Sequence, residues 1–440
     1  MNVNEALSYI HTVCWRGSKP GLSRTRTLLS KIGNPEKKLK FIHIAGTNGK
    51  GSTAAMLASI LQKAGYVTGL YTSPYIVRFG ERMQVNGQMI EDDELCRITE
   101  RLRLSADEMP DHPTEFEFVT AVAMEFFARH GCQIVVLEVG LGGELDSTNV
   151  IDVPEAAVIC NIGLDHTEIL GDTLEKIAAA KAGIIKPGGQ VVIYRGGESV
   201  EAVFEEKCRA VGAVLHKADF ASVRPLYCGL DGQRFDCGEY RELTLPLLGE
   251  HQLRNAAVVL KTVQVLRERG WDISDGNVRE GLSCVRWPGR FEILRREPLF
   301  IIDGGHNPQC IEALEQNVRQ YLGGRELTVL TGVLADKDYH SMYAGISQYA
   351  SRFFTVTPPN PRALSAQELA SYLTRFGKPV TACDSVEAGV KQALAAAGRD
   401  GAVLAYGSLY MLGDVIAASA DIPHAPLPPL CKGRWHLRSK

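Results

Sequence analysis

The segment Phe41-Ile42-His43-Ile44-Ala45-Gly46-Thr47-Asn48-Gly49-Lys50-Gly51-Ser52 decides how this chain is expected to fold. Its first five residues are an apolar run typical of a buried strand, and residues 52–64 are predicted to form a helix. The glycines between them let backbone N–H groups turn towards a phosphate, which the helix N-terminus also attracts. Lys50 can reach the outer phosphates, and the Ser52 hydroxyl can reach Mg²⁺. This segment therefore predicts a phosphate-binding loop (P-loop).

The match to the general P-loop pattern G-x-x-x-x-G-K-[ST] is incomplete. Ile44 stands where the pattern has its first glycine, and Gly51 follows the lysine. The alternative is a glycine-rich strand–helix turn with a solvated lysine. The order of strand, loop, lysine, hydroxyl and helix favours phosphate binding over that alternative.

Strands and helices alternate outward from this segment. Further apolar runs predict strands at residues 67–71, 134–137, 156–162 and 190–194, and residues 114–130 have the spacing of a helix with one buried face. Such alternation indicates an α/β protein with a doubly wound, mostly parallel sheet. Residues 219–245 predict a small antiparallel excursion, and a helix is expected over residues 251–269.

The alternation restarts after Trp287-Pro288-Gly289, with strands expected at residues 299–302, 327–330, 353–356 and 402–405. We therefore predict an N-terminal P-loop domain over residues 1–295 and a C-terminal Rossmann-like α/β domain over residues 296–425. Residues 426–440 are rich in proline and basic residues and have little to pack, so we predict a disordered tail there.

Composition excludes several classes of protein. The net charge is −3 over 440 residues, so no large basic field is expected to hold nucleic acid or an acidic membrane. The 11 cysteines include no C-x-x-C pair, which is typical of free thiols in a reducing compartment. With no signal peptide and no long apolar run, we expect a cytoplasmic protein.

Several polar residues follow predicted strands, at the edge where ligands of such folds collect. Ser73 offers a hydroxyl to a metal, or simply starts a turn before Pro74. Glu138 ends a buried strand and would suit Mg²⁺, or a salt bridge. His166 is either a metal ligand or a structural histidine. Asp303 could hold a ribose hydroxyl or act near the phosphates, or belong to an Asp–Gly turn with Asn307 capping the next helix.

Lys181 lies on a predicted helix, and the sequence alone predicts a surface lysine or a cation at a helix C-terminus.

Taken together, these patches resemble the folylpolyglutamate synthase/dihydrofolate synthase family of Mur-ligase-like amide-bond ligases. The motifs that carry the resemblance run in family order along the chain: Gly46-Thr47-Asn48-Gly49-Lys50-Gly51-Ser52, Tyr71-Thr72-Ser73-Pro74, Thr114-Glu115-Phe116-Glu117, Leu137-Glu138-Val139-Gly140-Leu141-Gly142-Gly143, Asp146-Ser147-Thr148-Asn149, Leu164-Asp165-His166-Thr167, Lys181-Ala182-Gly183-Ile184, Pro288-Gly289-Arg290-Phe291 and Asp303-Gly304-Gly305-His306-Asn307-Pro308. Each motif alone is weak, and their joint occurrence is specific.

The resemblance implies a role for each of these residues. ATP would be bound by Asn48, Gly49, Lys50, Gly51, Ser52, Asn255, Arg290 and Asp303. One Mg²⁺ would be held by Ser73 and Glu138 and a second served by His166, with a monovalent cation also in view. Lys181, modified by CO₂ to a carbamate, would act in catalysis with Lys50 and His166. The folate side would be lined by Thr114, Glu115, Phe116, Glu117, Leu145, Asp146 and Ser147, with His306 as a further substrate-binding residue.

The implied activity is ATP-dependent addition of L-glutamate to the glutamate tail of a reduced folate, through an acyl phosphate. Dihydropteroate is a second acceptor to consider, since some family members also use it. Two departures bear on this choice, because family members often have a basic residue at Glu144 and an acidic residue at Ala180. The rivals are a Mur-type cell-wall ligase, a non-ligase P-loop ATPase and a catalytically silent binding protein. A monomer is expected.

Overall fold

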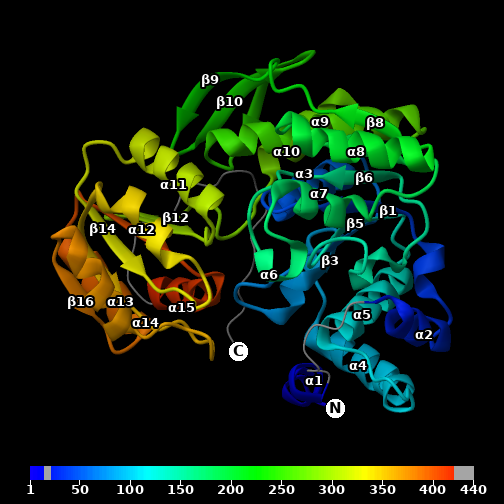
Figure 1. Cartoon of the computed structure of the whole chain (residues 1–440), viewed down its shortest axis with the longest axis horizontal. Coiled ribbons are helices and arrows are strands. Elements are labelled where there is room, and N and C mark those ends of the chain that lie inside the picture. The colour runs from blue at the N-terminus through cyan, green and yellow to red at the C-terminus, as the bar shows by residue number, and fades with distance from the viewer. Residues whose placement is uncertain (14–20, 421–440) are drawn as a thin grey trace. The chain divides into compact units, whose positions relative to one another are not determined.

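Residues Phe41–Ala45 form β1, an inner strand of an eight-stranded sheet, in the computed structural model, which describes residues 1–13 and 21–420 (Figure 1). The strand order is β4-β3-β2-β5-β1-β6-β7-β8, and the strands from β2 to β8 are parallel. Only the short β3–β4 hairpin at one edge runs antiparallel. The predicted doubly wound α/β sheet is confirmed.

The strands of this sheet are β1, β2 (Thr68–Tyr71), β3 (Met83–Val85), β4 (Gln88–Met89), β5 (Ile134–Glu138), β6 (Ala156–Ile159), β7 (Gln190–Ile193) and β8 (Val214–Lys217). The accompanying helices are α1 (Val3–Ser8), α2 (Ser23–Lys31), α3 (Lys50–Lys63), α4 (Asp92–Asp107), α5 (Glu115–Arg129), α6 (Thr167–Leu170), α7 (Leu174–Ala182), α8 (Glu198–Val211), α9 (Glu250–Glu268) and α10 (Asp275–Cys284). Short turns of π or 3₁₀ helix occur at η1 (Tyr9–Val13), η2 (Pro35–Lys38), η3 (Phe79–Arg82) and η4 (Ser147–Val150).

Both faces of the sheet are covered, which explains why its inner strands are mostly apolar. Helices α3, α9 and α10 pack together, and α9 contacts β6 and β7. On the other face, Leu137 of β5 lies in a core cluster with residues of α4 and α5, and Ala157 of β6 lies in one with residues of α7 and α8. Successive residues of β1 therefore point alternately towards these two layers.

The predicted antiparallel excursion is a three-stranded sheet of order β11-β10-β9. Its strands are β9 (Arg224–Gly229), β10 (Gly232–Cys237) and β11 (Tyr240–Leu245). The Gln233 side chain is buried, and its amide nitrogen donates to the carbonyl oxygens of Leu247 and Gly249.

A second, six-stranded sheet has the order β12-β13-β17-β14-β15-β16, in which only β12 is antiparallel to its neighbour. Its strands are β12 (Glu292–Arg296), β13 (Leu299–Asp303), β14 (Leu327–Thr331), β15 (Ala350–Thr355), β16 (Val380–Ala382) and β17 (Ala402–Tyr406). The helices beside it are α11 (Pro308–Tyr321), α12 (Tyr339–Ser347), α13 (Ala366–Leu373), the 3₁₀ turn η5 (Thr374–Phe376), α14 (Val386–Ala397) and α15 (Leu409–Ala420).

The chain divides into two compact units. The first comprises Met1–Tyr227, Arg234–Thr244 and Glu250–Trp287, and the second comprises Cys228–Gln233, Leu245–Gly249 and Pro288–Lys440. The boundary that we predicted between the two domains, at residues 295 and 296, falls within strand β12. It stays a prediction. The tail predicted at residues 426–440 lies outside the described residues.

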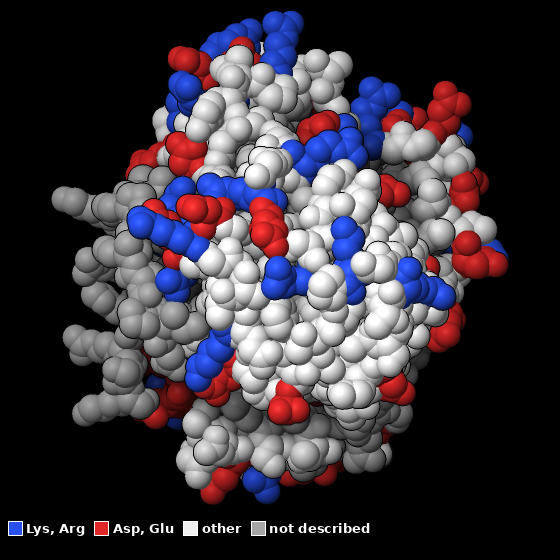
Figure 2. Space-filling model, turned by 90° about the vertical axis from the view of Figure 1, so that its left-hand side faces the viewer, with Lys and Arg blue, Asp and Glu red and all other residues white. Residues whose placement is uncertain are grey.

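Charged side chains of both signs are interspersed on the face that Figure 2 shows, and broad uncharged areas separate them. Within the described ranges, no helix is long and apolar enough to cross a membrane. The nine cysteines that the structure describes are free, and most of their thiols are buried.

The packing of α10 against α3 depends on a glycine. A Cβ added at Gly281 would lie 2.5 Å from the Cα of Ile60, so the two helix backbones touch there. We predict that Gly281→Ala lowers the free energy of unfolding by about 2 kcal/mol, because overpacking forces the helices apart.

Gly276 of the same helix is the matched control, because it is exposed and an added Cβ meets nothing closer than 3.5 Å. Gly276→Ala should leave stability unchanged or raise it by up to about 1 kcal/mol. Urea titration of both variants checks this, and equal stability of the two would contradict the packing argument.

Candidate active site

The loop between β1 and α3 is held in place by its own backbone. Gly46 has φ 149° and Gly49 has φ 86°, conformations in the region of positive φ that favours glycine. The N–H groups of Thr47 and Asn48 both donate to the carbonyl oxygen of Asn161, at 2.8 and 3.2 Å. The segment that follows β6 therefore fixes the shape of the loop.

Three side chains approach the loop so closely that a side chain at any of its glycines would force a neighbour to shift. An added Cβ would lie 2.7 Å from Cβ of Cys160 at Gly46 and 2.6 Å from Oδ1 of Asn255 at Gly49. At Gly51 the same atom would lie 2.7 Å from the indole of Trp287. Gly51 departs from the general P-loop pattern, and the nearby Trp287 indole gives a steric reason for a glycine at this position.

Helix α9 brings two buried amides to the start of α3. The Gln252 amide nitrogen donates to Oγ of Ser52 at 3.2 Å, and the Asn255 amide nitrogen donates to Oε1 of Gln252 at 3.1 Å. The sequence prediction included Asn255 and missed Gln252. The signal was available, because residues three apart on a helix lie on one face.

Lys50 begins α3, and its ammonium donates to the carbonyl oxygens of Gly46 and Thr47 at 3.1 and 3.2 Å. The cation therefore lies over the loop that carries the free backbone N–H groups of the helix start. A phosphate placed on this loop would meet both the helix N-terminus and a lysine.

Glu138 ends β5 beside the loop, paired in register with Ile44 of β1, and its side chain is buried. Its Oε2 accepts the backbone N–H of Ser73 at 3.2 Å, which brings the Ser73 hydroxyl to the same strand edge. One carboxylate and one hydroxyl fit Mg²⁺, which takes few protein ligands and completes its shell with substrate phosphates and water. The described residues contain no cluster of three His, Cys, Asp or Glu side chains that could hold a metal ion.

Lys181 is buried, with 4% of its surface exposed, so the prediction of a surface lysine from sequence alone is wrong. Burial, reinforced by repulsion from Lys50, lowers the pKa of the Lys181 ammonium to about 7. The packing has a clear cause, because an added Cβ would lie 2.9 Å from the carbonyl oxygen of Ala180 at Gly143 and 2.2 Å from Cβ of Glu144 at Gly183. These two glycines let the loop after β5 lie directly on α7.

The buried Cys160 marks where these groups converge. Burial raises the pKa of its thiol to about 11, and Lys50, Glu138 and Lys181 all act on it electrostatically. The structure therefore brings the lysine of the loop, the carboxylate of β5 and the lysine of α7 together at one edge of the sheet.

His166 lies next to this edge in a left-handed conformation with φ 50°, at the start of α6, and about half of its side chain is exposed. Its Nε2 is 3.9 Å from Oδ1 of Asp165, whose own charge acts on Lys181. Asp165 is thus an acidic group near Lys181.

The segment Thr114-Glu115-Phe116-Glu117 opens α5, and much of its chemistry is structural. Thr114 and Glu117 cap the helix reciprocally, and Glu117 forms a buried ion pair with Arg24, at 2.9 Å. Glu115 lies 3.2 Å from Nδ1 of His11. Phe116 packs on the next loop, since a Cβ added at Gly140 would lie 2.4 Å from its ring.

Leu145 and Asp146 lie on the loop between β5 and η4, and Ser147 begins η4. Leu145 is exposed, whereas Asp146 and Ser147 are buried. The Ser147 hydroxyl lies 3.3 Å from that of Thr120 on α5. Of these three residues, Leu145 presents a large apolar surface to its surroundings.

The predicted residues of the second unit gather where β13 ends. Asp303 accepts the N–H groups of Phe291 and Gly305 at 2.8 and 2.7 Å, and burial raises the pKa of its carboxyl. Arg290 packs on the loop after β13, because a Cβ added at Gly304 would lie 2.5 Å from its Nη1. His306 lies on the same loop and donates its Nδ1–H to the carbonyl oxygen of Gly304 at 2.8 Å. Asn307 caps α11.

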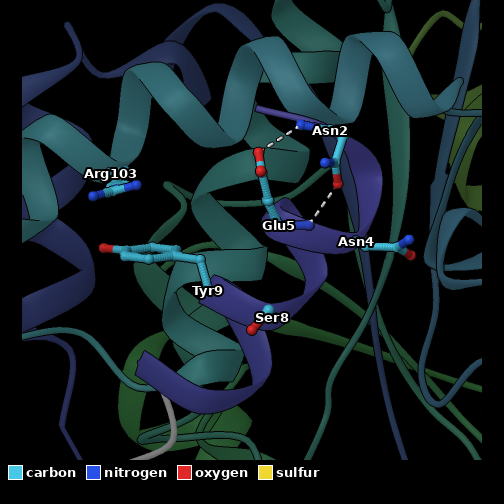
Figure 3. Close-up of a pocket in the computed structure, with 6 residues that line it drawn as sticks. All are labelled: Asn2, Asn4, Glu5, Ser8, Tyr9 and Arg103. Atoms are coloured by element: carbon cyan, nitrogen blue, oxygen red, sulfur yellow. Dashed lines mark hydrogen bonds between the residues drawn. The ribbon is translucent and has the colours of Figure 1, made fainter.

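A surface hollow of about 480 Å³ lies elsewhere in the first unit, beside α1 (Figure 3). It is lined by Asn2, Asn4, Glu5, Ser8, Tyr9 and Arg103, none of them a predicted site residue.

The lowered pKa of Lys181 makes stability depend on pH. Between the unfolded value near 10.5 and the folded value near 7, the unfolded chain holds a proton that the folded chain does not. Stability therefore falls as pH drops through this window. We predict that Lys181→Met is more stable than wild type by a few kcal/mol at pH 6 in bicarbonate-free buffer, and that the difference shrinks towards zero above pH 10.

Denaturant titrations of both proteins between pH 6 and pH 10.5 measure this difference. A stability gap that does not change with pH would contradict the buried, uncharged amine.

The comparisons with known proteins agree with this geometry. Residues 44–263 match the Mur ligase middle domain, and residues 289–409 match the Mur ligase glutamate ligase domain. A dihydrofolate synthase/folylpolyglutamate synthase of Bacillus subtilis is 36% identical over 93% of this chain and 97% of its own. A folylpolyglutamate synthase of Thermotoga maritima is 34% identical, with a TM-score of 0.84 over 95% of this chain and 97% of its own.

The Escherichia coli FolC protein, solved in complex with DHPP and ADP, is 28% identical, with a TM-score of 0.83 over 95% of this chain and 97% of its own. The resemblance carried by the motifs is thereby confirmed. The chain belongs to the folylpolyglutamate synthase/dihydrofolate synthase family of Mur-type ligases.

Proposed function

We propose that this protein is an ATP-dependent ligase that adds L-glutamate to the glutamate tail of a reduced folate. The observation that carries the proposal is the meeting of the phosphate loop, Glu138 and the buried Lys181 at one strand edge. A protein that only binds a ligand has no chemical need to bury a lysine beside a second lysine. The names of the relatives, and the ADP and DHPP bound to one of them, support the same activity.

On the nucleotide side, Asn48, Gly49, Lys50, Gly51 and Ser52 bind the phosphates of ATP. The turn glycines, the helix start and the position of the Lys50 ammonium support this role. Asn255 of α9 lies against Gly49 and completes the phosphate site beside this loop. In the second unit, Arg290 and Asp303 bind the remainder of the nucleotide, and His306 contacts substrate, as their gathering at the end of β13 suggests.

Ser73 and Glu138 would hold one Mg²⁺, and His166 would serve a second. When bound, such a cation would supply positive charge against the negative charge of a transferring phosphoryl group. Lys50 does the same from the protein side, and the fixed loop positions the γ-phosphate for attack. A monovalent cation stays a prediction.

Lys181 is carbamylated by CO₂ in the working enzyme. Carbamate formation requires a neutral amine, and a pKa near 7 supplies a large neutral fraction at physiological pH. The modification replaces a buried neutral amine by an anion beside the Lys50 ammonium, so that a pair with no attraction becomes a pair of opposite charges.

The reaction has two steps. The acceptor carboxylate attacks the γ-phosphorus of ATP, which yields an acyl phosphate and ADP. The amine of L-glutamate then attacks the acyl carbon, so that an amide forms and phosphate leaves. Residues 114–117 and 145–147 line the acceptor side, and Glu117 contributes mainly by holding the start of α5 through Arg24.

Dihydropteroate is a second acceptor to test, because several relatives carry both activities in their names. Glu144, where family members often have a basic residue, lies on the loop that packs against α7, the helix of Lys181. A monomer in a reducing, cytoplasmic compartment stays a prediction, for which the free cysteines are the supporting observation.

A mass-resolved assay with ATP, Mg²⁺, L-glutamate and tetrahydrofolate tests the activity. We predict one phosphate released for each product that is heavier by one glutamate residue, with dihydropteroate run in parallel as the other acceptor. No product with either acceptor, despite ATP binding, would overturn the ligase assignment.

Lys50→Ala is the control in this assay. It should abolish turnover and leave the thermal midpoint close to that of wild type, because Lys50 bonds only to carbonyl oxygens of the loop surface. Surviving activity would refute the role of the loop.

Bicarbonate tests the carbamate without any turnover. We predict that adding bicarbonate at pH 8 raises the thermal midpoint of wild type, since a carbamate places a buried anion beside the Lys50 ammonium. Lys181→Met cannot respond, so it is the control for general salt effects. An equal response in both proteins would exclude the modification.

A further inference from the structure

His43 lies in the middle of β1, and its side chain is fully buried. It is in register with Leu137 of β5 and Ala157 of β6, whose side chains belong to the cores beneath α5 and α7. The imidazole therefore points away from α3 and α9, towards the layer of α5 and α7, on which residues 140–148 lie. A polar ring in such a place is costly unless its nitrogen atoms are hydrogen-bonded.

The ring contacts one polar side chain of that layer. Its Nε2 is 2.9 Å from Oγ1 of Thr148, and this hydroxyl is 2.5 Å from Oδ1 of Asp146. A hydroxyl has one proton to donate, and the short distance to the carboxylate is that of a charge-assisted bond. Thr148 therefore donates to Asp146, and His43 must donate its Nε2–H to Thr148.

The state of the ring agrees with this direction. Burial lowers the pKa of His43 to about 3, so the ring is neutral and carries a single proton. Its Nδ1 is buried and has no hydrogen-bond partner among the described residues. An orphaned acceptor costs less than an orphaned donor, so the proton resides on Nε2.

Asp146 uses its carboxylate to hold the loop around it. Oδ1 also accepts the N–H of Thr148 at 3.0 Å, and Oδ2 accepts the N–H of Leu141 at 2.9 Å. The N–H of Gly140 is a further donor. Burial raises the pKa of this carboxyl, and these donors oppose the rise by stabilising the anion. With its lone pairs filled by the chain, Asp146 fixes the shape of residues 140–148.

We propose that His43 is a positioning residue for the acceptor: through Thr148 it orients Asp146, which holds the loop of residues 140–148. The proposal rests on the proposed function only in assigning this loop to the acceptor side. The chain His43–Thr148–Asp146 links the strand that leads into the phosphate loop with the loop that receives the folate. Neither His43 nor Thr148 touches the reacting atoms.

Two amide substitutions at His43 separate positioning from simple packing. The amide nitrogen of glutamine reaches the place of Nε2, whereas that of asparagine reaches only the place of Nδ1. His43→Asn should raise the KM for tetrahydrofolate about tenfold, the usual effect of one lost buried hydrogen bond, and leave the KM for ATP within about twofold. His43→Gln should keep both KM values within about twofold of wild type. Equal effects of the two amides, or an equal change in the KM for ATP, would overturn the proposal.

Thr148 supplies a second pair in case a His43 variant does not fold. Thr148→Val removes the hydroxyl and should match His43→Asn, and Thr148→Ser should behave as wild type. Because both residues act through one chain of bonds, the double variant His43→Asn/Thr148→Val should be no worse than Thr148→Val alone. Effects that multiply would mean that the two residues act independently, which contradicts the proposal.

Hydrogen exchange gives a readout that does not need activity. Amides of residues 140–148 should exchange faster in His43→Asn and Thr148→Val than in wild type, and at the wild-type rate in His43→Gln and Thr148→Ser. Uniform exchange across all four variants would refute the linkage. A wild-type protein that adds no glutamate would refute the proposed function alone, since the exchange result stands apart from it.

Discussion

The turn after β1 depends on close contact between two backbones. The N–H groups of Thr47 and Asn48 share the carbonyl oxygen of Asn161, and Gly46 lies so near Cys160 that no side chain fits between them. This contact sets the direction in which α3 leaves the sheet, and so the direction of its N–H groups. Because Asn161 follows β6, the phosphate loop takes its shape from the order of strands in the sheet as well as from its own glycines.

The sequence was sufficient to predict most of the parallel strands and the loops that follow them. Apolar runs bounded by glycine and polar residues predicted β1, β5 and β13. Parallel pairing within the first sheet then required the carboxyl ends of β1 and β5 to share an edge. Helix ends were less accurate, since α3 begins at Lys50, two residues before the predicted start. The lysine thereby becomes part of the helix N-terminus, where its backbone N–H also faces the loop.

The burial of Lys181 could not be predicted from its neighbours in sequence. It arises because Gly143 and Gly183 allow the loop after β5 to touch α7, with the Asn149 amide donating to Glu144 and Gly183 across the contact. Such a contact joins segments that are 34 residues apart at the hydrogen bond from Asn149 to Gly183, and it has no periodic signature. The contact of Gln252 with Ser52, 200 residues away, is equally invisible in the sequence, although the position of Gln252 one helical turn before Asn255 was a usable signal. Only the family resemblance indicated that Lys181 had a role.

Strand β1 serves both sides of the site through its alternation. Ile42 and Ile44 face the layer of α3 and α9, which supports the phosphate loop, whereas His43 faces the layer of α5 and α7. A hydrophobic residue at position 43 would also fill the core. It would, however, leave the Thr148 hydroxyl without the donor from His43. The Thr148 hydroxyl, which donates to Asp146, would then be less firmly oriented. The polar residue in this apolar strand is thus best explained by what it orients. A single strand then leads into the phosphate loop at its end and, through His43, contacts the segment of residues 140–148 at its centre.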